Sequence, residues 1–209
     1  MSDFQSSSLL PFHDLMAGII AAMEARDAYT ASHSMRVSDM TEIICSLLDL
    51  SEEQAEEIHI AAHVHDIGKI GIEDSILRKK SPLNEMEWLS IKQHPIIGFN
   101  ILSKVSCFEE IAKIVRYHHE RWDGNGYPDG IRENEIPLGS RIIAIADSID
   151  AMMSNRQYRK SLSSTQCRDE IHKNSGIMYD PVIAEKVLKN WGAIVDEITF
   201  DYSKAINEC

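Results

Sequence analysis

The chain has 209 residues, 44% hydrophobic and 26% charged, so it is long enough and apolar enough to fold around a sizeable core. It carries 21 Lys and Arg against 33 Asp and Glu, a formal net charge of −12. A protein that binds nucleic acid by neutralising phosphates has the opposite balance, which argues against such binding. Any anionic ligand must therefore be held by bound metals or by a local basic patch.

The cysteine pattern argues against a disulfide framework and against a thiolate zinc site, because no two cysteines form a CxxC pair. The four cysteines are Cys45, Cys107, Cys167 and Cys209. No stretch approaches the roughly eighteen uninterrupted apolar residues of a membrane-spanning helix. We therefore expect a cytoplasmic protein with neither nucleic acid nor membrane as a partner.

The first half of the chain is predicted to be helical after a short flexible tail at residues 1–10, which contains three consecutive serines. Apolar residues recur at three- and four-residue steps over Val37–Leu47, which predicts one face of an amphipathic helix. Ser51 and Gln54 have the spacing of a capping box, which predicts the start of a helix that runs to about Asp66.

The second half is also predicted to be helical. Pro95 can occupy the first turn of a helix that ends near Leu102. Further helices are expected at Phe108–Tyr117, Leu138–Met153, 164–174 and 181–191. Gly, Pro, Asp and Asn crowd into residues 123–137, which predicts a loop. Without strand patterns, repeats or a linker, residues 11–209 are expected to form a single all-α domain.

Two adjacent pairs of ligand-type residues lie where predicted helices end. His65 and Asp66 form the first pair, and His118 and His119 form the second. Neighbours on a helix point about 100° apart, so both members of a pair reach one ion only at a helix end, or else they serve two ions. The His-Asp motif alone is a weak signal. Together with His33, His94, the His118-His119 pair and Asp147 in one small helical domain, it is a strong indication of a metal site.

Asp147 lies inside an apolar helix, where a carboxylate is costly unless it pairs with a cation or binds a metal. The alternative is that it faces solvent. His33 and His94 are further candidate ligands, although an isolated histidine is more often structural. Imidazole and carboxylate without thiolate suit divalent transition metals such as iron or manganese.

At these residues the sequence resembles the HD-GYP family, a branch of the HD-domain metal-dependent phosphohydrolases, from about Leu15 to Leu188. The motifs that carry the resemblance are Glu24–Ser34, His65–Gly71, His94–Gly98, His118–Gly130, Ile136–Leu138, Ala146–Arg159 and Tyr179–Pro181. Their number and order identify the chain as a member of this family. The resemblance implies a compact multi-helix bundle with a Gly-rich loop around Gly126-Tyr127-Pro128.

The resemblance also implies an activity and a set of ligands. Family members hydrolyse cyclic dinucleotides, chiefly cyclic di-GMP, to linear pGpG or onward to GMP. One metal would be held by His33, His65, Asp66 and Asp147, and the second by His94, His118 and His119, with Asp66 bridging the two. Two metals about 3.5–4 Å apart can clamp a phosphodiester and activate water. Asp66 and Lys69 would be the catalytic residues.

Four residues are expected to bind substrate by the same resemblance. Lys69, one turn after His65, resembles the family lysine that touches the scissile phosphate; the alternative is an exposed lysine at a helix end. Arg156 and Arg159 resemble cations that hold the nucleotide phosphates, and they also suit the C-terminal dipole of a helix. Tyr127 would shape the nucleotide pocket, with packing or contact to a partner domain as alternatives.

Two further residues are expected beside the ligands. Asp150, one turn after Asp147, could order the ligand shell. Relatives with a third metal carry a glutamate four residues before the first ligand histidine, where this chain has Tyr29. A neutral phenol is a poor ligand for iron or manganese, so we expect two metals per chain and pGpG as the main product. Glu24 or Asp27 could supply a carboxylate instead.

Three functions are compatible with the sequence. The first is a cyclic di-GMP phosphodiesterase; the second is an HD-type hydrolase of another nucleotide, including cyclic GMP-AMP; the third is a catalytically silent sensing or interaction module. The complete ligand set and Lys69 favour an enzyme, and the Gly-Tyr-Pro loop favours the first function. The family alone suggests GGDEF (diguanylate cyclase) domains as partner proteins.

Overall fold

The computed structural model describes residues 18, 21, 33–154 and 160–199. Within these ranges all regular structure is helical and no strand occurs, so the predicted all-α class is confirmed. The expected tail at residues 1–10 lies outside the described residues, as do Tyr29, Arg156 and Arg159. None of the helices in the described ranges combines the length and hydropathy needed to cross a membrane.

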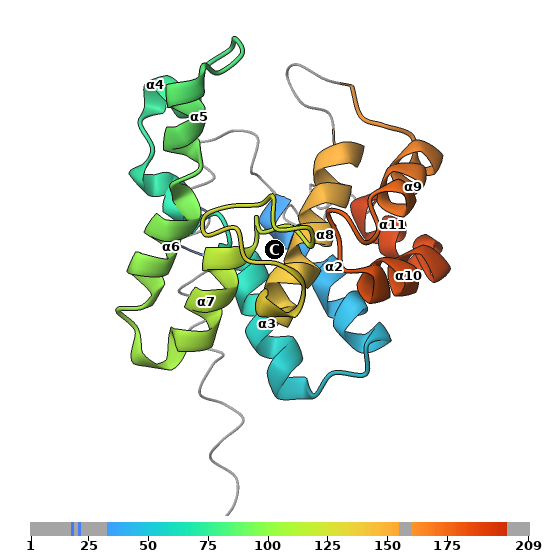
Figure 1. Cartoon of the computed structure of the whole chain (residues 1–209). Helices are drawn as coiled ribbons and strands as arrows, with labels where there is room; N and C mark the ends of the chain where they lie inside the picture. The colour runs from blue at the N-terminus through green and yellow to red at the C-terminus, as the bar shows by residue number, and fades with distance from the viewer. Residues whose placement is uncertain (1–17, 19–20, 22–32, 155–159, 200–209) are drawn as a thin grey trace, which may run out of the picture.

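The helices form a central layer with a group on either side (Figure 1). Helices α2, α3 and α8 lie in the middle, α4 to α7 lie on one side, and α9 to α11 on the other. Their bounds are α2 His33–Leu47, α3 Glu52–Val64, α4 Asp74–Leu77, α5 Glu85–Ile91, α6 His94–Leu102, α7 Glu109–Tyr117, α8 Leu138–Met153, α9 Ser164–Lys173, α10 Pro181–Lys189 and α11 Trp191–Thr199. Short 3-10 helices are η1 Ile67–Gly71, η2 Ser106–Phe108 and η3 Glu133–Glu135.

Side-chain caps determine where several helices begin. The capping box predicted at Ser51 and Gln54 is present at the start of α3, and Asn84 with Glu87 forms another at the start of α5. The capping-box spacing of Asn84 and Glu87 is visible in the sequence as well, but helix α5 was not predicted from it. Helices α4 and α11 were not predicted either. The helix predicted at 181–191 ends at Lys189, because the chain turns at Asn190 before α11 begins.

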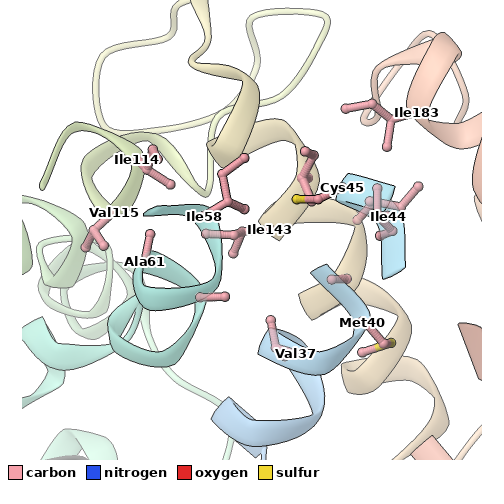
Figure 2. Close-up of a cluster of buried hydrophobic side chains, with 14 of the residues drawn as sticks. Val37, Met40, Ile44, Cys45, Ile58, Ala61, Ile114, Val115, Ile143 and Ile183 are labelled. Atoms are coloured by element: carbon pink, nitrogen blue, oxygen red, sulfur yellow. The ribbon is translucent and has the colours of Figure 1, made fainter. Parts of the chain in front are cut away.

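The apolar stripe that predicted α2 is buried against α3, α8, α10 and α11, and several of its side chains are drawn in Figure 2. Val37, Met40 and Ile44 on this stripe are each 0% exposed. On the facing helices, Ile58 and Ile143 are also buried. Each such side chain contributes about 1.5–3 kcal/mol of transfer free energy, so this core fixes α2, α3 and α8 side by side.

One close backbone contact brings the start of α6 against the segment that follows α3. A methyl group on Gly68, in η1, would lie 1.8 Å from the carbonyl oxygen of His94 and 2.6 Å from the backbone nitrogen of Gly98. Only glycine allows η1 and α6 to approach this closely. The contact places the end of α3 directly beside the start of α6.

Candidate metal centre

Two groups of ligand-type side chains, all buried except the half-buried His119, meet where α2, α3, α6 and α7 converge. The first group is His33, His65 and Asp66, and the second is His94, His118 and His119. Within each group the ligand atoms all lie within 4.8 Å of one another. The structure therefore brings together six of the seven residues predicted as ligands, from four separate segments of the chain.

Three of the imidazoles are held in one tautomer by the backbone. The Nδ1 atoms of His65, His94 and His118 donate to the carbonyl oxygen three residues earlier, at 2.7, 2.8 and 2.6 Å. A carbonyl oxygen only accepts, so Nδ1 carries the proton and Nε2 of the neutral ring presents a lone pair. Backbone or carboxylate partners on the remote nitrogen are typical of metal-binding histidines.

The acceptor nitrogens of His94 and His118 face each other at 3.3 Å. Burial lowers the pKa of His94, and burial with neighbouring imidazoles holds the pKa of His118 well below its usual range. Both rings are therefore neutral near pH 7. Two lone pairs at this distance repel unless a cation lies between them, so the donor set fits a metal ion.

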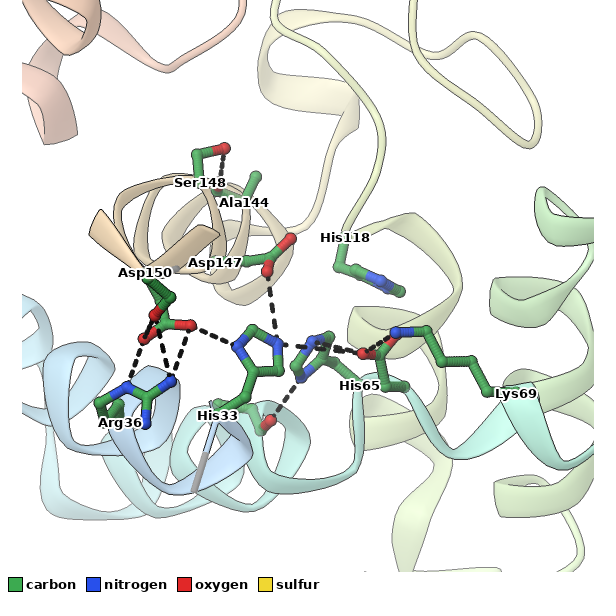
Figure 3. A network of polar contacts seen from close by, with 12 residues as sticks. His33, Arg36, His65, Lys69, His118, Ala144, Asp147, Ser148 and Asp150 are labelled. Carbon is green, nitrogen blue, oxygen red and sulfur yellow. Dashed lines mark hydrogen bonds and ion pairs between the residues drawn. The ribbon is translucent and has the colours of Figure 1, made fainter. Parts of the chain in front are cut away.

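Asp66 stands between the two groups. Its Oδ1 lies 3.4 Å from Nε2 of His94, whereas its Oδ2 lies 3.5 Å from Nε2 of His65 and 3.9 Å from that of His33. Lys69 Nζ donates to Oδ2 at 2.6 Å (Figure 3). Burial alone would raise the pKa of Asp66, but Lys69 and the imidazoles hold it well below the usual range. The carboxylate is therefore ionised, with one oxygen toward each group.

Asp147 faces the centre from α8 and does not point out to solvent. Its Oδ1 lies 3.5 Å from Nε2 of His33, and its side chain is only 19% exposed. Burial lowers the pKa of His33, but the hydrogen bond to Asp150 and the charge of Asp147 outweigh burial and raise it overall. A positive ion at this position would replace the proton that these carboxylates favour on His33.

Asp150 lies behind His33, with its side chain 0% exposed (Figure 3). It accepts a hydrogen bond from His33 Nδ1 at 2.7 Å and two from Arg36, at 2.5 and 3.2 Å. The Asp150 pKa is lowered despite burial, because His33 and Arg36 favour the charged carboxylate. The sequence reasoning missed Arg36, although its place one turn after His33 was a readable signal.

The loop after α7 is anchored beside the site by glycine and by a buried carboxylate. A methyl group on Gly126 would lie 2.4 Å from the backbone nitrogen of Arg121 and 2.5 Å from Cα of Glu120, so this crossing requires glycine. Glu120 Oε1 accepts the backbone N–H groups of Asp129 and Gly130 at 2.7 and 2.9 Å. Glu120, which was not predicted, therefore holds the loop in place.

Tyr127 packs on the second group of ligands. Its ring centroid lies 4.8 Å from that of His119, at an interplanar angle of 31°. Burial, together with the negative charges of Asp147 and Asp66, raises the Tyr127 pKa, so the phenol is neutral. Of the remaining histidines, His59 and His63 contact each other with Nε2 atoms 3.1 Å apart on α3, outside both groups.

Comparison with known proteins places the chain in a family. Residues 17–183 match the family described as HD domain. The chain belongs to the HD-domain family, and its similarity to curated phosphodiesterases confirms the HD-GYP resemblance seen in the motifs. It is 42% identical over 187 residues to a cyclic di-GMP phosphodiesterase of Thermotoga maritima and 35% identical over 184 residues to 3'3'-cGAMP-specific phosphodiesterase 2 of Vibrio cholerae.

These similarities cover 88% and 87% of this chain but 50% and 35% of the two relatives, so the chain spans half or less of their length. A solved structure of a cyclic GMP-AMP-specific phosphodiesterase from V. cholerae has a TM-score of 0.68 at 20% identity. The structural match covers 92% of this chain and 52% of the solved chain. At this identity the match shows a shared fold.

Proposed function

We propose that the chain hydrolyses cyclic dinucleotides, cyclic di-GMP in particular, to linear pGpG at a centre of two divalent metals, iron or manganese. The observation that carries this proposal is the facing pair of acceptor nitrogens on His94 and His118, 3.3 Å apart, beside a carboxylate that points one oxygen at each ligand group. Such an arrangement of neutral imidazoles and charged carboxylates suits the binding of two cations. In an apolar core without cations, burial of these groups would only cost free energy.

The ligands divide into two sets in this proposal. His33, His65, Asp66 and Asp147 would hold one metal, and His94, His118 and His119 would hold the second, with Asp66 shared. When bound, paired metals of this kind activate water and stabilise charge on a phosphodiester.

The protein's own groups complete the proposed site. Asp66 stays ionised and keeps Lys69 Nζ at 2.6 Å, on the rim of the first group. From there Lys69 would neutralise charge on the scissile phosphate. Asp150 orients His33, and Tyr127 gives the second group a neutral aromatic wall. Arg156 and Arg159, beyond the described residues, stay part of the proposal as phosphate-binding cations on the strength of the family motif.

A second candidate substrate is 3'3'-cyclic GMP-AMP. Its support is the 35% identity to the V. cholerae enzyme that is specific for it. The ligand set serves either substrate, because both present a phosphodiester and differ only in one base. A GGDEF domain as partner protein is supported by the family resemblance alone, and copurification with such a domain would test it.

The test is turnover by the manganese- or iron-loaded chain, kept anaerobic, with cyclic di-GMP, cyclic GMP-AMP and cyclic di-AMP, followed by identification of products by mass spectrometry. We expect pGpG from cyclic di-GMP. Asp66→Ala should lower turnover to below about 1% while circular dichroism stays helical, because the shared ligand is lost. Glu185→Ala, at an exposed carboxylate on α10, is the matched control and should behave as wild type.

Three results would overturn the proposal. Asp66→Ala with wild-type turnover at equal metal loading would exclude the shared-ligand role. Undiminished turnover after complete chelation would exclude metals altogether. Tight binding of cyclic dinucleotides by the fully metal-loaded protein without any hydrolysis would instead assign the chain as a silent sensing module.

A further inference from the structure

Lys92 lies at the rim of the second ligand group and belongs to none of the predicted sites. It is the C-cap residue of α5, two residues before His94. Its Nζ lies 5.2 Å from the ring centroid of Tyr127, and that ring lies against His119. Lys92, Tyr127 and His119 therefore form a continuous stack that leads from an exposed ammonium group into the proposed metal centre.

Lys92 differs in its partners from the other cations near the centre whose positions the structure describes. Those cations are each held by a carboxylate: Lys69 by Asp66, Arg36 by Asp150, and Arg116 by Asp129. In the described part of the chain, by contrast, no carboxylate lies within ion-pair distance of Lys92, and its ammonium contacts only an aromatic face. A cation–π contact at an exposed site is worth about 0.5–1 kcal/mol. Such a contact positions the ammonium without neutralising its charge.

The substrate class of the proposed function needs a cation at such a position. A cyclic dinucleotide carries two phosphodiester groups on opposite sides of its ring, each with one negative charge. The metal centre and Lys69 can serve only the one that is cleaved. The other must be held elsewhere, on a protein whose formal net charge of −12 otherwise repels it. A lysine suits this role, because its flexible stem carries a point charge with three donors.

We infer that Lys92 binds the non-scissile phosphate of the cyclic dinucleotide, with Tyr127 as the aromatic platform that positions its ammonium. This inference rests on the proposed function. Lys92 approaches from the α5 and α6 side of the centre, whereas Arg156 and Arg159 follow α8 in the sequence. Lys92 is therefore a substrate-binding residue for the half of the ligand that is not cleaved.

The experiment compares two substrates on the full metal-loaded chain: cyclic di-GMP, with two phosphates, and bis(p-nitrophenyl) phosphate, with one. For Lys92→Gln we expect KM for cyclic di-GMP to rise about tenfold, or about 1.4 kcal/mol, with kcat within twofold. The rise should be at least fivefold larger than for the single-phosphate substrate. Lys92→Arg, which keeps the charge, should restore most of the affinity. Lys104→Gln, at an exposed lysine after α6, is the matched control and should leave both KM values unchanged.

The possible outcomes distinguish a failure of this inference from a failure of the proposed function on which it rests. An unchanged KM for cyclic di-GMP in Lys92→Gln, in an active enzyme, would overturn the role of Lys92 alone. Equal losses on both substrates would do the same, because they would show that Lys92 acts through Tyr127 and the metal ligands. A wild-type chain that hydrolyses no cyclic dinucleotide would overturn the proposed function itself.

Discussion

Arg36 stabilises a carboxylate that has no access to solvent. It pairs with Asp150 through two hydrogen bonds, and Asp150 in turn holds Nδ1 of His33. Removing the guanidinium would leave the buried charge with only His33 and a long hydrogen bond from Ser154 Oγ, at 3.4 Å. Breaking buried pairs in this way costs about 3–5 kcal/mol. Because the same carboxylate orients a proposed metal ligand, the loss should extend to metal affinity, by about 10- to 100-fold.

The prediction for Arg36→Met is a loss of about 3 kcal/mol in the free energy of unfolding of the metal-free protein, measured by urea denaturation. Arg121→Met is the control, because Arg121 makes a similar two-point pair with Asp123, but this pair is only half-buried, with side chains 33% and 23% exposed. Water still reaches Asp123, unlike Asp150, so the control should lose clearly less, about 1 kcal/mol. Equal losses in the two variants would contradict the structural role given to Arg36.

Lys69 gives a second prediction at this scale. Its Nζ contacts Asp66 but lies outside both ligand groups. In Lys69→Gln we expect kcat/KM for cyclic di-GMP to fall roughly tenfold to a few hundredfold, about 1.4–3.5 kcal/mol of transition-state stabilisation. Bound metal, measured by atomic emission, should stay at the wild-type level. A parallel loss of metal would show that Lys69 supports the fold of the site and not the phosphate.

At the scale of elements, the contact between η1 and α6 sets the distance between the two ligand groups. The α3 end carries His65 and Asp66, and α6 begins with His94. The two segments can approach as they do because Gly68 has no side chain. Close packing of backbone on backbone cannot be relieved by a rotamer change, so any added atom must push the groups apart.

We predict that Gly68→Ala lowers the free energy of unfolding by about 3 kcal/mol, at the upper end of overpacking costs, and reduces metal content. Thermal denaturation and metal analysis of the purified variant measure both effects. Gly192→Ala is the matched control, since a methyl group there meets nothing within 4 Å on α11. Its stability should be unchanged or higher by up to about 1 kcal/mol, because alanine favours a helix. Wild-type stability in Gly68→Ala would show that the two segments can separate freely.

For the whole molecule, bound metals would act as cross-links among helices that are distant in sequence. The proposed ligands lie on α2, α6 and α8 and directly after the ends of α3 and α7, so they join all three helices of the central layer (Figure 1) to the group on one side. Ligand binding at one hundred times the dissociation constant adds about 2.7 kcal/mol to stability. Metal removal should therefore loosen the bundle as a whole and not one element of it.

The corresponding prediction is that chelation lowers Tm by about 5–10 °C, given about 2–4 °C per kcal/mol for a chain of this size. Asp66→Ala should show less than half this shift, since it lacks the shared ligand. Anomalous diffraction from metal-loaded crystals should reveal two metal positions, in keeping with Tyr29 in place of a carboxylate ligand. Three well-occupied positions would contradict the expected number of two metals per chain. An unchanged Tm after chelation would contradict the proposal that the metals cross-link the helices.

The sequence alone was sufficient for the all-α class, most helix positions and the identity of the candidate ligands. Helical periodicity and caps are local, so Val37–Leu47 and Ser51 could be interpreted without a structure. The candidate ligands could be named because His-Asp and His-His pairs at helix ends are unusual, and because the motifs resemble a known family. Short elements such as α4 and α5 were missed, because a few residues carry too little periodic signal.

Only the tertiary structure decided which polar groups meet. Asp150 and Arg36 are 114 residues apart in sequence, and His94 and His118 are 24 apart, so their hydrogen-bond partners depend on how α2, α6, α7 and α8 pack. The position of Lys92 over Tyr127 has the same origin, since it joins the end of α5 to the loop after α7. Local sequence preferences fix each helix, but charges and lone pairs act through space. Their partners are therefore set by the packed core that brings distant segments together.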